Sequence, residues 1–121
     1  MIRCVRLWSG DDQNSYFEDG WIELETGPRA DFLTGKLPAT TVSFQETASG
    51  GALDWHTAPV RQLVITLSGT LDFQTRDGDH FLLRPGDILL AEDTVVSSIG
   101  QCNTSCSLLA GVSKAKVFRG R

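Results

Sequence analysis

The sequence has no excess of positive charge and no long apolar run, and each shortage excludes a class of partner. Eleven lysines and arginines stand against fifteen aspartates and glutamates, which gives a net charge of −4. A protein that grips nucleic acid through its phosphates needs the opposite balance, so we expect no nucleic-acid partner. No apolar run approaches the roughly 18 residues of a membrane span, so we expect no membrane partner either.

Secretory features are missing as well. The N-terminal residues have no apolar stretch like that of a signal peptide, which favours a cytoplasmic location. The three cysteines, Cys4, Cys102 and Cys106, cannot all pair within one chain. Because cytosolic proteins normally keep their thiols reduced, we expect free cysteines. Cys102 and Cys106 could meet only if the residues between them made a tight turn.

A sustained helical period is absent, and what the sequence has instead is short strand-like segments separated by turns. Leu71 and Phe73 alternate with polar residues, as in a sheet that is buried on one face. A hairpin is predicted at Asp77 and Gly78. The predicted strands are 2–8, 16–25, 39–46, 62–75 with a hinge at Ser68 and Gly69, 80–83, 88–91 and 107–112. The basic tail is predicted to be a solvated end, and residues 1–121 to form one all-β domain.

Residues 50–69 contain a glycine turn, a histidine beside a tryptophan, and a strand that ends on glycine. This order resembles the first motif of the cupin family: a glycine, five residues, His-x-His, three or four residues, a glutamate, six residues and a glycine. The matching positions, without a gap, are Gly50, His56, Ala58, Gln62 and Gly69. A second cupin motif starts at Gly86. Its proline, glycine, histidine and asparagine positions hold Glu92, Thr94, Ser97 and Gln101.

The resemblance is closer to a group of small single-domain cupins. That group typically has a His-x-Ala-Pro-x-Arg-Gln run, a Leu-Ser-Gly turn and an Ala-Glu-Asp-Thr segment that ends in Gly-His. The run at 56–62, the turn at 67–69 and the segment at 91–94 are intact, whereas Ser98 and Ile99 replace the ending. The resemblance covers about 50–100 and implies a cupin-type double-stranded β-helix, which is a jelly-roll barrel.

Metal-binding cupins use the two histidines and the glutamate of the first motif and the histidine of the second. Here only His56 has the expected ligand type, because Ala58 has no donor, Gln62 has a neutral amide and Ser97 has a hydroxyl. A transition metal normally requires at least three protein ligands in a fixed array. We therefore expect no metal and no other cofactor. A metal-dependent, oxygenase-like cupin with His56, Gln62 and Glu92 as an unusual ligand set is a third interpretation of the function.

His56 is the only imidazole expected to face the barrel lumen, and it could exchange a proton near neutral pH. In an extended segment, Gln62, Val64 and Thr66 share its parity and would line one wall. Arg61 or Arg76 could meet an anion. Glu92 or Asp93 could orient the imidazole, or both could form a solvated turn. The aromatic residues expected as apolar walls are Trp21, Phe44, Trp55 and Phe73.

Two main interpretations of function remain. In the first, the protein is a metal-independent acid–base enzyme of the isomerase, cyclase, lyase or epimerase type. It would act on a small organic molecule with His56 as its proton carrier. In the second, it is a ligand-binding or assembly module without turnover, and His56 is simply hydrogen-bonded inside the barrel. Small cupins commonly pair through sheet edges, and 2–8 could form such an edge, so we also expect a homodimer.

Overall fold

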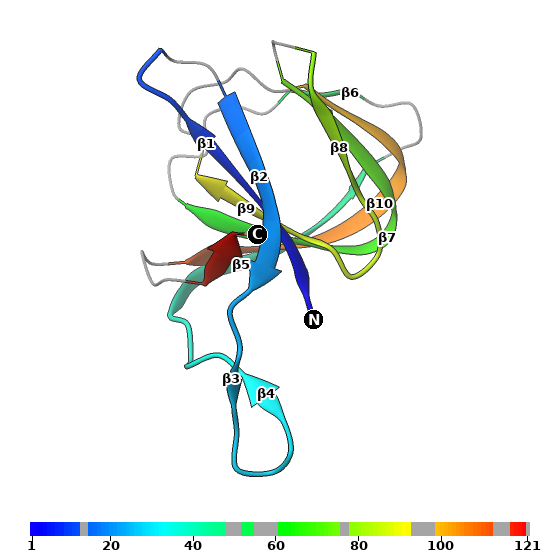
Figure 1. Ribbon diagram of the computed structural model, residues 1–121. Helices are drawn as coiled ribbons and strands as arrows, with labels where there is room; N and C mark the ends of the chain where they lie inside the picture. Colours follow the sequence, from blue (N-terminus) through cyan, green and yellow to red (C-terminus); the bar gives the residue numbers. More distant parts are fainter. Residues whose placement is uncertain are drawn as a thin grey trace.

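The computed structural model describes residues 1–12, 15–47, 52–54, 61–75, 78–92, 99–112 and 117–120, and their regular structure is entirely β-strand (Figure 1). The predicted all-β class is therefore confirmed, and these residues contain no helix that could cross a membrane. The strands are β1 (Arg3–Ser9), β2 (Ser15–Ile22), β3 (Glu25–Thr26), β4 (Phe32–Leu33), β5 (Ala39–Thr47), β6 (Ala52–Asp54), β7 (Gln62–Gln74), β8 (His80–Leu83), β9 (Ile88–Glu92), β10 (Ile99–Val112) and β11 (Phe118–Gly120).

Nine of these strands form one mixed sheet in the order β11-β2-β1-β9-β7-β10-β5, with β6 added to β10 and β8 added to β7. The β1–β9 pair is parallel and the others are antiparallel. The described parts of β11 and β5 end this path without pairing to each other, so the sheet does not close into a barrel there. The short β3–β4 hairpin projects away from the sheet (Figure 1).

The two longest strands, β7 and β10, curve strongly and connect different parts of the sheet (Figure 1). The first half of β7 pairs with β9, and its second half pairs with β8. Between these halves the register with β10 shifts, and Gly69 has a φ of 78°. Glycine adopts this left-handed conformation without the steric cost that a Cβ would add. At the predicted hinge of Ser68 and Gly69 the chain is thus one continuous strand, whose pairing with β10 is interrupted by β-bulges.

Both faces of the sheet carry apolar residues. The core face, as we call the side that bears Val5, Val64 and Leu89, holds the larger buried cluster; the other members are Leu7, Leu71, Phe73, Phe81, Leu83 and Ala91. Because side chains alternate along a strand, the neighbouring residues point to the opposite side, which we call the outer face. The outer face holds a smaller cluster of buried residues, which consists of Cys4, Ile22, Leu63, Leu90 and Val117.

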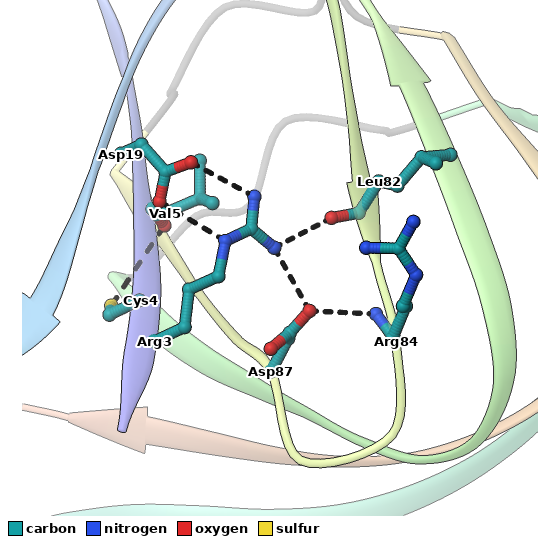
Figure 2. Close-up of polar contacts among 7 residues, drawn as sticks. All are labelled: Arg3, Cys4, Val5, Asp19, Leu82, Arg84 and Asp87. Carbon is teal, nitrogen blue, oxygen red and sulfur yellow. Dashed lines mark hydrogen bonds and ion pairs between the residues drawn. The ribbon is translucent and has the colours of Figure 1, made fainter. Parts of the chain in front are cut away.

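A network around Arg3 ties β1 to β2 and to the β8–β9 turn (Figure 2). Its Nε and Nη2 donate to the two oxygens of Asp19, both at 3.1 Å. Nη1 donates to the Leu82 carbonyl at 2.7 Å and to Asp87 Oδ2 at 2.9 Å. Burial alone would lower the pKa of Arg3, but the hydrogen bonds and charges of Asp19 and Asp87 outweigh it and raise the pKa. Arg3 therefore stays charged and fixes the turn that precedes β9.

Three predictions differ from the observed structure. The N-terminal strand is not an edge, because β1 pairs with β2 on one side and with β9 on the other. The tail is not merely a solvated end, since β11 pairs with β2 and Val117 is 1% exposed. The last long strand begins at Ile99 rather than 107. The first half of β10 is polar and has no apolar alternation, so the sequence does not indicate a strand there. It is a strand because it pairs with β6 and β7.

The cysteines are placed only in part. Cys4 is a free, buried thiol, and desolvation raises its pKa to about 12, which keeps it protonated and unreactive near neutral pH. The backbone around Cys102 and Cys106 is strand, so the tight turn that would let them meet is not formed. Their side chains lie outside the described residues.

Candidate functional site

The first half of β7 carries three of the predicted wall residues, Gln62, Val64 and Thr66. They share the core face, and Val64 and Thr66 are 2% and 1% exposed, whereas Gln62 is half-buried. The Thr66 backbone is fully engaged: its N–H donates to the Asp87 carbonyl at 3.1 Å, and Gly86 N–H donates to its carbonyl at 2.8 Å. The turn held by Arg3 thereby fixes the position of Thr66.

The hydroxyl of Thr66 is the chemically notable atom of this wall. Thr66 Oγ1 is buried and has no hydrogen-bond partner within the described part of the chain. Threonine supplies one donor and two acceptor positions, and buried polar atoms in native proteins nearly always find a partner. A buried hydroxyl without one costs free energy, so its position requires an explanation in terms of a further molecule or a function.

The three predicted aromatic wall residues that the structure describes do not form one group. Phe73 is fully buried in the core, with its ring centroid 5.1 Å from that of Phe81. Trp21 is half-buried on β2 and pairs with Arg3 across the strands. Phe44 is 74% exposed on β5. Of the three, Phe73 is therefore a core residue and Phe44 a surface residue.

Several predicted site residues fall outside the described residues. These are His56, Trp55 and Asp93, together with Arg76 and the motif positions Ala58 and Ser97. The role of His56 as proton carrier and of Asp93 as its partner therefore stays a prediction. In the residues that are described, no three histidine, cysteine, aspartate or glutamate side chains lie close enough to hold a metal ion.

Glu92, predicted to orient His56, is engaged by two arginines. Arg6 Nε donates to Glu92 Oε1 at 2.7 Å, and Arg61 Nε lies 3.3 Å from Glu92 Oε2. The three residues meet because β1 runs parallel to β9, with Trp8 opposite Glu92, while Arg61 precedes the part of β7 that pairs with β9. Alternation along β9 turns Glu92 to the outer face with Leu90, away from Val64 and Thr66.

An open pocket of about 340 Å³ surrounds this arginine–glutamate group. Its polar lining is Arg6, Arg61, Glu18 and Glu92, and its other lining residues are Leu90, Val117, Phe118 and Gly120. The guanidinium carbon of Arg6 lies 4.6 Å from the centroid of the Trp8 ring, a cation–π distance. The sequence predicts Arg61 as a possible anion partner but gives no indication of Arg6, whose contact with Glu92 spans 86 positions.

No protein-family model matches the chain, and no curated protein matches it. The described residues offer two candidate groups of functional side chains. They are the buried wall of β7 on the core face and the charged pocket on the outer face.

Proposed function

We propose that this protein binds a small organic molecule against the core face of β7, in a cupin-type jelly-roll arrangement. The buried hydroxyl of Thr66 carries the proposal: it has no hydrogen-bond partner among the described residues, and a bound ligand atom would supply one. Gln62 lies on the same face and adds an amide that can both donate and accept. Val64 between them adds an apolar surface. Ligand sites combine such apolar walls with a few placed polar groups.

Two observations support the cupin-type arrangement. The residues that match the first motif run into β7, and its final glycine, Gly69, has a positive φ and lies within the register shift between β7 and β10. The two long curved strands, each paired with different neighbours along its two halves, are typical of strands that connect the two sheets of a jelly roll.

Catalysis is the second part of the proposal. His56 would transfer a proton to or from the molecule held by Gln62 and Thr66, in an isomerase, cyclase, lyase or epimerase type of reaction without a metal. Since Arg6 and Arg61 engage Glu92, Asp93 is the carboxylate that we assign to orient the imidazole. The alternative function is a binding module without turnover, which needs Gln62 and Thr66 alone.

Replacing Thr66 by valine tests the proposed site. Valine has nearly the same shape but no hydroxyl, so the ligand-free protein no longer buries an unpartnered polar atom. We expect the free energy of unfolding to rise by about 1–2 kcal/mol in chemical denaturation, while the bound small molecule is lost. Native mass spectrometry of the purified protein, compared with its denatured mass, measures the bound molecule.

Thr75 provides the matched control. It is also buried, at 4% exposure, but its hydroxyl donates to the Asp79 carbonyl at 3.2 Å. Thr75→Val should therefore lower the free energy of unfolding by about 1 kcal/mol and leave ligand binding unchanged. A wild-type protein without any bound molecule, or a Thr66→Val variant that binds as wild type does and is less stable, would argue against the site.

We also propose that the partner of this chain is a second copy, paired through β5 rather than through the N-terminal strand. Residues 39–46 of β5 are all exposed, with Val42 at 58% and Phe44 at 74%. The strand ends the sheet, has no internal proline, and has Glu46 as its single charge. Such an edge lacks the features that normally prevent strand pairing, so it suits antiparallel pairing across a two-fold axis.

Light scattering at micromolar concentration measures the assembly. We expect twice the monomer mass of 13.2 kDa for the wild type and the monomer mass for Val42→Lys, which places a charge on the paired edge. A mass near 13.2 kDa for the wild-type protein would show that the exposed edge of β5 does not pair.

A further inference from the structure

The outer-face pocket is a second group of functional side chains that the proposed core-face site does not use. Its floor is formed by Arg6, Arg61 and Glu92, where the two Nε atoms approach different oxygens of the same carboxylate at 2.7 and 3.3 Å. Glu92 contacts Arg6 only through Nε, which leaves the other N–H groups of the Arg6 guanidinium able to bind a second anion. An anionic group is therefore the ligand that Arg6 attracts.

Arg6 is held in a fixed orientation within this floor. Glu92 accepts from its Nε, and the Trp8 ring lies against its guanidinium plane, with 4.6 Å between the guanidinium carbon and the ring centroid. The Trp8 ring is in turn stacked on Tyr16, with 6.0 Å between the centroids. The terminal nitrogens Nη1 and Nη2 of Arg6 make no hydrogen bond within the described residues. A guanidinium so fixed can bind both oxygens of a carboxylate at little cost in side-chain entropy.

The other residues that line the pocket indicate which further groups a ligand would carry besides an anionic one. Glu18 lies opposite Arg6 in the β1–β2 register, is exposed, and has no ion-pair partner in the part of the chain that is described. Its carboxylate lies against Gly120, where an added Cβ would require the end of the Glu18 side chain to move. Leu90, Val117 and Phe118 add apolar surface. The pocket therefore presents a positive group, a negative group and an apolar wall within about 340 Å³.

We infer that this pocket binds a small zwitterion of the α-amino-acid class with an apolar side chain. The ligand carboxylate pairs with the terminal nitrogens of Arg6. The ammonium pairs with Glu18, and the side chain lies against Leu90 and Val117. This site is on the opposite sheet face from Thr66, so it stands independently of the proposed core-face site.

Three matched probes test the inference by titration calorimetry on the full chain. L-leucine has both charges, 4-methylpentanoate has only the carboxylate, and 3-methylbutylamine has only the ammonium. We expect L-leucine to bind at least about tenfold more tightly than either single-charge probe, since each charged contact contributes at least that factor. Chemical-shift changes at the Val117 and Phe118 amides in nitrogen-15 spectra should place the probe in the pocket.

Variants separate the two charged contacts. Arg6→Gln should weaken L-leucine binding by at least about tenfold. Glu18→Gln should reduce L-leucine to the affinity of 4-methylpentanoate and leave that carboxylate probe unchanged. Because Glu18 is exposed, this second variant remains informative even if Arg6→Gln does not fold. Arg29→Gln removes the same type of charge from the distant β3–β4 hairpin and should change nothing. Thr66→Val should also leave L-leucine binding intact.

The inference is overturned if L-leucine shows no binding at millimolar concentration or binds no more tightly than 3-methylbutylamine. It is equally overturned if Glu18→Gln leaves the preference for L-leucine over 4-methylpentanoate unchanged. A loss of L-leucine binding in Thr66→Val together with shifts confined to β7 would assign the probe to the core-face site and reject the outer pocket.

Discussion

Replacing Phe73 by alanine is expected to lower the free energy of unfolding by about 3–5 kcal/mol, the usual cost of removing a buried ring. Phe73 is fully buried, and its ring is stacked on Phe81, which pairs with it across β7 and β8. Phe81 also contacts Phe17 of β2, with 4.7 Å between the centroids. The cavity left by the substitution cannot collapse easily, because hydrogen bonds between the strands hold the surrounding backbone.

Urea denaturation measures this effect, and Phe32→Ala is the matched control. Phe32 is 68% exposed on the projecting β3–β4 hairpin, so its loss should change stability by less than about 0.5 kcal/mol. Equal effects of the two substitutions would contradict the placement of Phe73 at the centre of the core.

Replacing His56 by glutamine should cut turnover by roughly 10²- to 10⁴-fold if the protein is an acid–base enzyme, since a positioned general acid or base typically contributes that factor. Glutamine keeps the polarity and much of the volume of histidine but cannot titrate. Ligand binding through Gln62 and Thr66 should therefore persist. The substrate for the assay is to be identified by mass spectrometry of the molecule released on denaturation.

His80→Gln is the control, because it removes the other histidine of the chain. His80 is exposed on β8, with Nδ1 3.3 Å from Asp72 Oδ1, and should not affect turnover. A His56→Gln variant with wild-type turnover would make His56 a structural residue. A ligand that is bound but never converted would favour the binding module over the enzyme.

Apolar alternation and turn residues in the sequence predicted the strands and the hairpin whose formation depends on neighbouring residues. Alternation and turn residues identified β5, β8 and β9 nearly to the residue, and Gly78, with a φ of 93°, closes the predicted hairpin. The failures concern strands that non-local pairing stabilises. β11 forms because it pairs with β2, and β1 is interior because β9 pairs with its other side. Neither partner is recognisable within the segment itself.

The candidate site also has a part that local sequence predicts and a part that depends on non-local strand pairing. Parity along β7 placed Val64 and Thr66 on one face, and both are buried there. Parity also turns Glu92 towards the outer face, but its two arginine partners depend on the parallel register of β1 with β9. No sequence pattern connects Arg6 with a carboxylate 86 positions away. Charged pockets assembled across a sheet therefore require the topology before the residues can be grouped.

The most direct test of a bound molecule at the β7 wall is a crystal structure of protein purified without added small molecules. We predict electron density for an organic molecule within hydrogen-bond distance of Thr66 Oγ1, with Gln62 also in contact. A Thr66 hydroxyl that is bonded only to protein, with apolar side chains filling the adjoining space, would contradict it.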